Sequence, residues 1–112
     1  MEVRAIQKNT GVPASKVRPL ADLIRGKGVE KALTLLKFIP TPKAKLVARV
    51  VQSAAANAEN NFQMDPADLK VVKIYVDEAT SLRRFRPRSR GRVSPVRKRS
   101  SHITVVVAEQ EG

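Results

Sequence analysis

Residues 69–107 read LKVVKIYVDEATSLRRFRPRSRGRVSPVRKRSSHITVVV, with an apolar run at each end and a basic segment between them. In the first run, residues 69–76, the side chains alternate with the two-residue period of a strand. This alternation predicts that Val72, Ile74 and Val76 share one face of a sheet and that the residues between them share the other.

The second apolar run, residues 103–107, predicts another strand, with Ile103, Val105 and Val107 on one face. Between the two strands, residues 83–99 contain nine Arg and Lys and no Asp or Glu. The whole chain of 112 residues has 22 Lys and Arg against 10 Asp and Glu, so three quarters of its net charge of +12 lies in this segment. Because buried charges without partners are costly, the segment cannot pack into a core, and it indicates a polyanionic partner.

The basic segment is predicted to form a two-stranded arm. Arginines recur at every second position from Arg84 to Arg92, so an extended chain presents them along its edges. Pro87 and Pro95 exclude a helix and a central strand, but an exposed ribbon tolerates them. With a turn at residues 89–91, the tip lies roughly 27 Å beyond the body. The alternative is a solvated, disordered charge run, and the two flanking strands favour the arm.

The arginines of this arm suit the phosphates of a nucleic acid. A guanidinium is always charged, and its planar fork matches phosphate oxygens in a bidentate way. If Z such contacts form on a flexible RNA, the logarithm of the affinity falls with the logarithm of salt concentration at a slope of about −0.7Z. Phe85 either stacks on a base or packs at the base of the arm, and the sequence favours neither role.

The chain before the arm is predicted to be mainly helical. Helices are expected at about residues 15–25, 29–39 and 42–60, and a short strand at residues 3–8. Ser15 is the expected N-cap of the first helix, and Thr41 with Pro42 is a strong start for the third. Pro19, four positions past Ser15, is expected to remove only the first intrahelical hydrogen bond.

This order of elements predicts an α+β fold. Three helices pack on a small three-stranded antiparallel sheet, and a long extended basic β-hairpin arm projects from it. We expect one domain over residues 1–112, with a globular body at residues 1–80 and 102–112 and an arm at residues 81–101.

The composition argues against several classes of protein and site. No cysteine is present, so the chain has no disulfide framework and no thiolate metal site, and a reducing compartment is expected. The N-terminal residues do not resemble a signal peptide, and the longest apolar stretch, Val105–Ala108, is far too short to cross a membrane. His102 is the only histidine and the ten carboxylates are scattered, so we expect no metal, no cofactor and no enzymatic activity.

The sequence resembles a known family over nearly its whole length. The residues that carry the resemblance are 15–27 (SKVRPLADLIRGK), 53–61 (SAAANAENN), 73–78 (KIYVDE), 83–92 (RRFRPRSRGR) and 97–107 (RKRSSHITVVV). In this order they resemble the bacterial large-subunit ribosomal proteins of the L-twenty-two family. The resemblance implies a cytoplasmic, ribosomal location, with the body on the outer surface of the large subunit near the exit of the nascent-peptide tunnel. It also implies that the hairpin threads ribosomal RNA and that its tip forms part of the tunnel wall.

The resemblance also implies which residues bind and which partners they meet. The implied rRNA-binding residues are Lys16, Arg18, Arg25, Lys27, Arg83, Arg84, Arg86, Arg88, Arg90, Arg92, Arg97, Lys98 and Arg99. The implied tunnel tip comprises Pro87, Arg88, Ser89, Arg90, Gly91 and Arg92. The expected partners are large-subunit rRNA, neighbouring large-subunit proteins and the nascent peptide at the tip, with no membrane and no homo-oligomer.

Two positions depart from the family's usual pattern. Pro19 stands where an aliphatic residue is usual, which predicts an irregular start to the first helix. Arg86 stands where a Met- or Leu-like residue is usual, which makes the arm more cationic near the tunnel.

Two other functions are alternatives to rRNA binding. A nucleoid-type protein whose β-ribbon wraps DNA, with Pro87 as a wedge, would need an intertwined dimer, and the chain offers no additional dimer core. A nuclease would need clustered carboxylates or a placed base, and activity dependent on Asp77 or His102 would indicate one.

Overall fold

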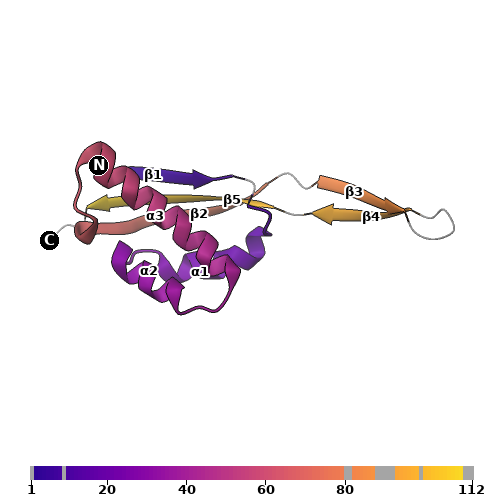
Figure 1. Ribbon diagram of the computed structural model, residues 1–112, viewed down its shortest axis with the longest axis horizontal. Helices are drawn as coiled ribbons and strands as arrows, with labels where there is room; N and C mark the ends of the chain where they lie inside the picture. Colours follow the sequence, from indigo (N-terminus) through magenta and orange to yellow (C-terminus); the bar gives the residue numbers. More distant parts are fainter. Residues whose placement is uncertain (1, 9, 80–81, 88–92, 99, 110–112) are drawn as a thin grey trace.

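The computed structural model describes residues 2–8, 10–79, 82–87, 93–98 and 100–109. The elements follow the order β1 (Glu2–Gln7), α1 (Ala14–Ile24), α2 (Val29–Lys37), α3 (Pro42–Phe62), a 3-10 turn (Pro66–Asp68), β2 (Leu69–Glu78), β3 (Leu82–Pro87), β4 (Val93–Lys98) and β5 (Ser101–Glu109). Figure 1 shows a helical and sheet body from which β3 and β4 project. The predicted α+β fold class is confirmed.

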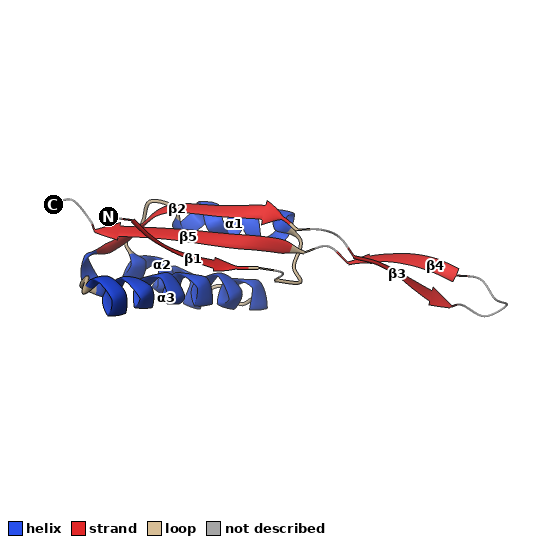
Figure 2. Cartoon of the chain, turned by 90° about the horizontal axis from the view of Figure 1, so that it is seen from above, coloured by secondary structure: helices blue, strands red, loops and turns tan. Residues whose placement is uncertain are grey.

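The body sheet has the strand order β1-β5-β2, and both pairings are antiparallel. The last strand in the chain is therefore the central one, because β5 returns from the arm between β1 and β2. Helix α3 packs on β1 and β5, while α1 packs on β2, so the helices form a second layer on the sheet. Figure 2 shows the arm leaving the sheet at the end opposite Glu2 and Glu109.

A single apolar core lies between the two layers. The predicted stripe of α3 is buried, namely Val47, Val50, Val51, Ala54, Ala55 and Ala58. From the sheet, Ile103, Val105 and Val107 are all fully buried, which confirms the face predicted for the last strand. The small alanines of α3 let its backbone approach the sheet closely.

The face predicted for residues 69–76 is wrong at Val71 and Val72. Val71 is fully buried and Val72 is only partly buried, although strict alternation places Val72 with Ile74. The cause is a bulge, because Val71 pairs with Val107 and Lys73 with Val106, which leaves Val72 as an extra residue. The bulge returns Ile74 and Val76 to the core face.

Helix α2 ends at Lys37 rather than at about residue 39, and two further helix ends differ from the predictions. Helix α1 begins at Ala14 with Pro13 as its N-cap, so Ser15 lies inside the helix and is not the cap. Pro19 is then the sixth helical residue, and the hydrogen bond it removes is an interior one rather than the first. Helix α3 continues past Asn60 to Phe62 and ends at Gln63, which takes the left-handed conformation (φ 55°). The start at Thr41 is confirmed, since its side chain accepts from the Lys43 N–H.

Strands β3 and β4 form a two-stranded sheet separate from the body sheet. They pair antiparallel from Leu82 opposite Lys98 to Pro87 opposite Val93. The predicted tip residues Arg88, Ser89, Arg90, Gly91 and Arg92, together with Arg99, lie outside the described residues. The arm gives the molecule an elongated shape with principal extents of 66 × 27 × 18 Å.

Within the described part of the chain, no helix is sufficiently long and apolar to span a membrane.

Candidate nucleic-acid interface

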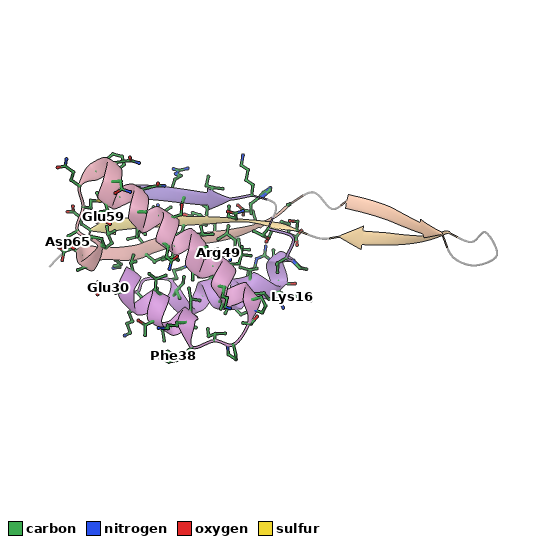
Figure 3. All side chains as sticks on the ribbon, viewed as in Figure 1. Lys16, Glu30, Phe38, Arg49, Glu59 and Asp65 are labelled. Carbon is green, nitrogen blue, oxygen red and sulfur yellow. The ribbon has the colours of Figure 1, made fainter. Side chains whose placement is uncertain are left out.

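The four predicted body cations lie on α1 and the turn that follows it. Lys16, Arg18 and Arg25 are exposed and Lys27 is partly buried. Figure 3 places Lys16 at the end of the body from which β3 and β4 leave. These side chains are therefore on the surface, where a phosphate can approach them.

Residues of α1 and of the turn after it form hydrogen bonds along the outer edge of β2. The Arg18 Nη2 group donates to the Val76 carbonyl (3.3 Å), and the Arg25 Nη2 group donates to the Ile74 carbonyl (2.9 Å). Further along, the Gly26 N–H donates to the Val71 carbonyl, and the Val71 N–H donates to the Lys27 carbonyl. Unpaired strand edges invite association with other chains, so this segment also protects the sheet.

This arrangement places three of the four predicted body cations in a row. Lys27 lies beside Val71, Arg25 beside Ile74 and Arg18 beside Val76, so the row follows β2 toward the arm. We call these three residues the edge row. Arg25 also forms an ion pair with Asp22 (2.6 Å). A guanidinium has five N–H donors, and the bonds to described residues use one in Arg18 and two in Arg25, so donors remain for phosphate.

The register of β3 and β4 places one pair of arm cations directly opposite each other. Arg83 is directly opposite Arg97, Arg84 is opposite Val96, and Lys98 is opposite Leu82. The structure thus brings together, from two strands, cations separated by up to fifteen positions in the sequence. Like charges directly opposite each other destabilise a strand pair, and a lone two-stranded ribbon is only marginally stable in water. The arm is therefore suited to an anionic partner that neutralises it.

The root of the arm contains hydroxyl groups that the sequence interpretation missed. Ser101 is fully buried, and its hydroxyl donates to the Val12 carbonyl (2.8 Å) and lies 2.8 Å from the Thr10 hydroxyl. Ser100 accepts the Gly11 N–H at its side chain (2.9 Å) and the Ala79 N–H at its carbonyl (3.1 Å). We call this cluster the root latch. It ties the loop before α1 to the point where the chain returns from the arm.

One feature of the sequence could have predicted the root latch. The alternation of Ile103, Val105 and Val107 extends back to position 101, so Ser101 falls on the core face. A hydroxyl at a core position needs a hydrogen-bond partner, which predicts a polar contact at the root.

Replacing Ser101 with alanine is expected to lower the free energy of unfolding by about 1–3 kcal/mol, because the Thr10 hydroxyl and the Val12 carbonyl lose a buried partner. Urea denaturation followed by circular dichroism measures this loss. Ser53→Ala is the matched control, since Ser53 is exposed on α3 and alanine favours a helix. An equal effect of the two substitutions would show that the latch contributes nothing to stability.

The described residues hold no group of three or more His, Cys, Asp and Glu side chains able to bind a metal ion.

Comparison with known proteins gives the chain its family. A family model described as "Ribosomal protein L22p/L17e" matches residues 5–108. The chain belongs to the ribosomal protein L22p/L17e family. The match covers both the body and the arm, and it confirms the resemblance drawn from the five sequence blocks.

Individual members of the ribosomal protein L22p/L17e family are similar to this chain over nine tenths or more of their length. A large ribosomal subunit protein uL22 of Dehalococcoides mccartyi is 65% identical over 109 residues, which are 97% of this chain and 100% of the relative. The protein of the same name from Pediococcus pentosaceus is 51% identical over 110 residues, covering 97% of this chain and 93% of the relative. The protein of the same name from Ligilactobacillus salivarius is 51% identical over 105 residues, which are 94% of this chain and 91% of the relative.

Proposed function

We propose that this chain is a structural protein of the large subunit of the cytoplasmic ribosome and that it binds large-subunit rRNA. The relatives at 65% and 51% identity are named as large ribosomal subunit proteins, which supports this assignment. The observation that carries rRNA binding is the basic two-stranded arm, which pairs Arg83 opposite Arg97 outside the body sheet.

Among its described residues, the arm has no second layer to pack on. Strands β3 and β4 pair only with each other. Such a ribbon contributes little to the stability of the body, so its role lies in what it binds. Packed rRNA supplies phosphates on both sides of a ribbon, and arginines alternating along the strands meet them on both sides.

The edge row extends the proposed surface onto the body. Lys27, Arg25 and Arg18 follow β2 toward the arm, and Lys16 lies at the arm end of the body. One RNA segment running along this edge reaches the arm without crossing the helical layer. We therefore include the four body cations with Arg83, Arg84, Arg86, Arg97 and Lys98 in one rRNA-binding surface.

The finer placement follows the family resemblance. We propose a single domain over residues 1–112, with the body at residues 1–80 and 102–112 near the tunnel exit. The arm at residues 81–101 threads rRNA, and Pro87–Arg92 form part of the tunnel wall beside the nascent peptide. Arg88, Arg90, Arg92 and Arg99 belong to the proposed rRNA-binding set. Neighbouring large-subunit proteins complete the partners, and the role is structural, without catalysis, cofactor or homo-oligomer.

The chain is expected to stay with the large subunit through a wash at about 0.5 M salt, because many phosphate contacts act together. Sucrose-gradient sedimentation with immunodetection measures this. Recovery of the chain at the top of the gradient, free of subunits, would contradict the proposal.

A chain without residues 84–95 is the control for the arm. Its helical circular dichroism signal should remain, because the described residues of the deleted segment belong to strands β3 and β4, and less of the chain should stay with the subunit. Loss of the helical signal would show that the segment belongs to the core.

A further inference from the structure

A groove lies between α2 and α3, and none of its lining residues belongs to the edge row. It has a volume of about 450 Å³ and is lined by Leu33, Thr34, Leu36, Lys37, Ile39, Lys45, Ala48, Arg49 and Gln52. On α3, Lys45, Ala48, Arg49 and Gln52 follow one another at helical spacings of three and four, so they form one stripe along the groove. Figure 3 shows Arg49 on the helical layer, with Phe38 at the turn after α2.

The floor of this groove is aliphatic. Leu33, Ile39 and Ala48 are partly buried and pack against the core, while Leu36 belongs to the core itself. Phe38, next to the floor, is 78% exposed, the largest exposure among the large apolar side chains that the structure describes. The fold thus leaves apolar surface accessible at this place.

The rim of the groove carries positive charge only. Lys37, Lys45 and Arg49 are its three ionisable residues, and residues 31–58 contain five cations and no carboxylate. This segment accounts for the whole surplus of +5 in residues 1–82, whose other cations and carboxylates balance. The two ion pairs recorded between described residues lie elsewhere, at Arg25–Asp22 and Lys73–Glu2.

We propose that this groove binds an acidic amphipathic segment of another protein. Aliphatic side chains of the segment lie on the floor, and its carboxylates meet Lys37, Lys45 and Arg49 at the rim. This is the recognition of a helix in a groove, with apolar anchors at helical spacing and charge complementarity around them. The proposal goes beyond rRNA binding, since it concerns a different surface and a different class of partner.

The aliphatic floor argues for a protein segment rather than RNA. Exposed bases are recognised mainly by stacking on aromatic rings or guanidinium planes, which Arg49 and Phe38 offer only beside the floor, whereas the floor itself consists of Leu, Ile and Ala. Leucine or isoleucine side chains, by contrast, gain from leaving water on such a floor. The cations then select segments whose polar face is acidic.

Fluorescence anisotropy tests the proposal with the full chain and a labelled synthetic peptide of about four helical turns, built of Leu and Glu with all Leu on one helical face. The measurement is made at about 0.2 M salt to screen long-range attraction to the basic arm. A peptide of the same composition with Leu and Glu scrambled is the control. We expect the amphipathic peptide to bind at least about tenfold more tightly than the scrambled one, because only it presents an apolar face to the floor.

Two charge-matched variants locate the site. The first variant combines Lys45→Glu with Arg49→Glu and should weaken binding of the amphipathic peptide by about tenfold or more. The second combines Arg4→Glu in β1 with Lys8→Glu after it, both at exposed positions, and should change the affinity less than about twofold. Equal losses in the two variants, or equal binding of the two peptides, would overturn the proposal. Circular dichroism confirms that each variant is folded.

Two further outcomes separate this site from the proposed rRNA surface. The Lys45→Glu, Arg49→Glu variant should still be retained by large subunits, since it leaves the arm and the edge row intact. In NMR spectra of the full chain, the peptide should shift the amides of residues 33–52. Shifts there with a single-stranded oligoadenylate, and none with the peptide, would identify the groove as an RNA site and overturn the proposal.

Discussion

Replacing Arg83, Arg84, Arg86, Arg97 and Lys98 with glutamine is expected to weaken binding to large-subunit rRNA by about two orders of magnitude at about 0.2 M salt. All five residues lie in β3 and β4, and the substitutions keep side chains of comparable size. The body fold should remain, because these strands pair only with each other.

The expected size follows from the release of counterions. Each lost phosphate contact on a flexible RNA changes the slope of log affinity against log salt by about 0.7, so five contacts reduce it by about 3.5. At about 0.2 M salt, this slope corresponds to the predicted loss of two orders of magnitude. Filter binding or anisotropy over a series of salt concentrations measures both the slope and the affinity.

A body variant with the same loss of charge is the matched control. This variant replaces five cations of α2 and α3 with glutamine, namely Lys31, Lys37, Lys43, Lys45 and Arg49. We expect less than about a tenfold loss of rRNA affinity, because these residues lie outside the arm and the edge row. Equal losses in the two variants would show that net charge, rather than the shape of the arm, determines binding.

Deleting Val72 is expected to leave the body folded, at a cost of about 1 kcal/mol or less in the free energy of unfolding. The residue is the extra one of the bulge in β2, so its removal leaves Val71 opposite Val107 and Lys73 opposite Val106 as consecutive pairs. Every buried residue of the strand then keeps its face, and strict alternation is restored.

Deleting Tyr75 is the contrasting change. It also removes one residue from β2, but it breaks the alternation of Ile74 and Val76, so one of these two core residues must face water. We expect a loss of at least about 3 kcal/mol, similar to emptying a core position, which is a large part of the stability of a small domain. Thermal and urea denaturation of both variants measure the difference. Equal destabilisation by the two deletions would show that the bulge has a role beyond register.

Most element positions were predictable because each is set by residues close together in the sequence. The stripe of α3 and the start at Thr41-Pro42 depend on helical spacing and a cap within one turn, and both predictions are confirmed. The same reasoning was wrong at Ser15, because the N-cap is Pro13, two residues before the favoured capping residue. It was also wrong at Val72, because alternation alone does not reveal where a partner strand leaves one residue unpaired.

The candidate site was predictable only in its charged residues. The density of arginine predicts the arm, and the resemblance adds Arg18 and Arg25 as body contacts. The sequence does not show that these two arginines also donate to carbonyls of β2. Their acceptors, Val76 for Arg18 and Ile74 for Arg25, lie 58 and 49 residues away in the chain.

The sequence by itself determined the types of the elements, the apolar stripes, the basic arm and the family. These features depend on periodicity and charge over short stretches of sequence. They can therefore be recognised without knowing how distant parts of the chain pack together. Only the tertiary structure decided the bulge at Val72, the root latch between Thr10 and Ser101, the edge row along β2 and the groove between α2 and α3. Each of these joins separate segments of the chain, so it exists only when packing and strand register have fixed their distances and directions.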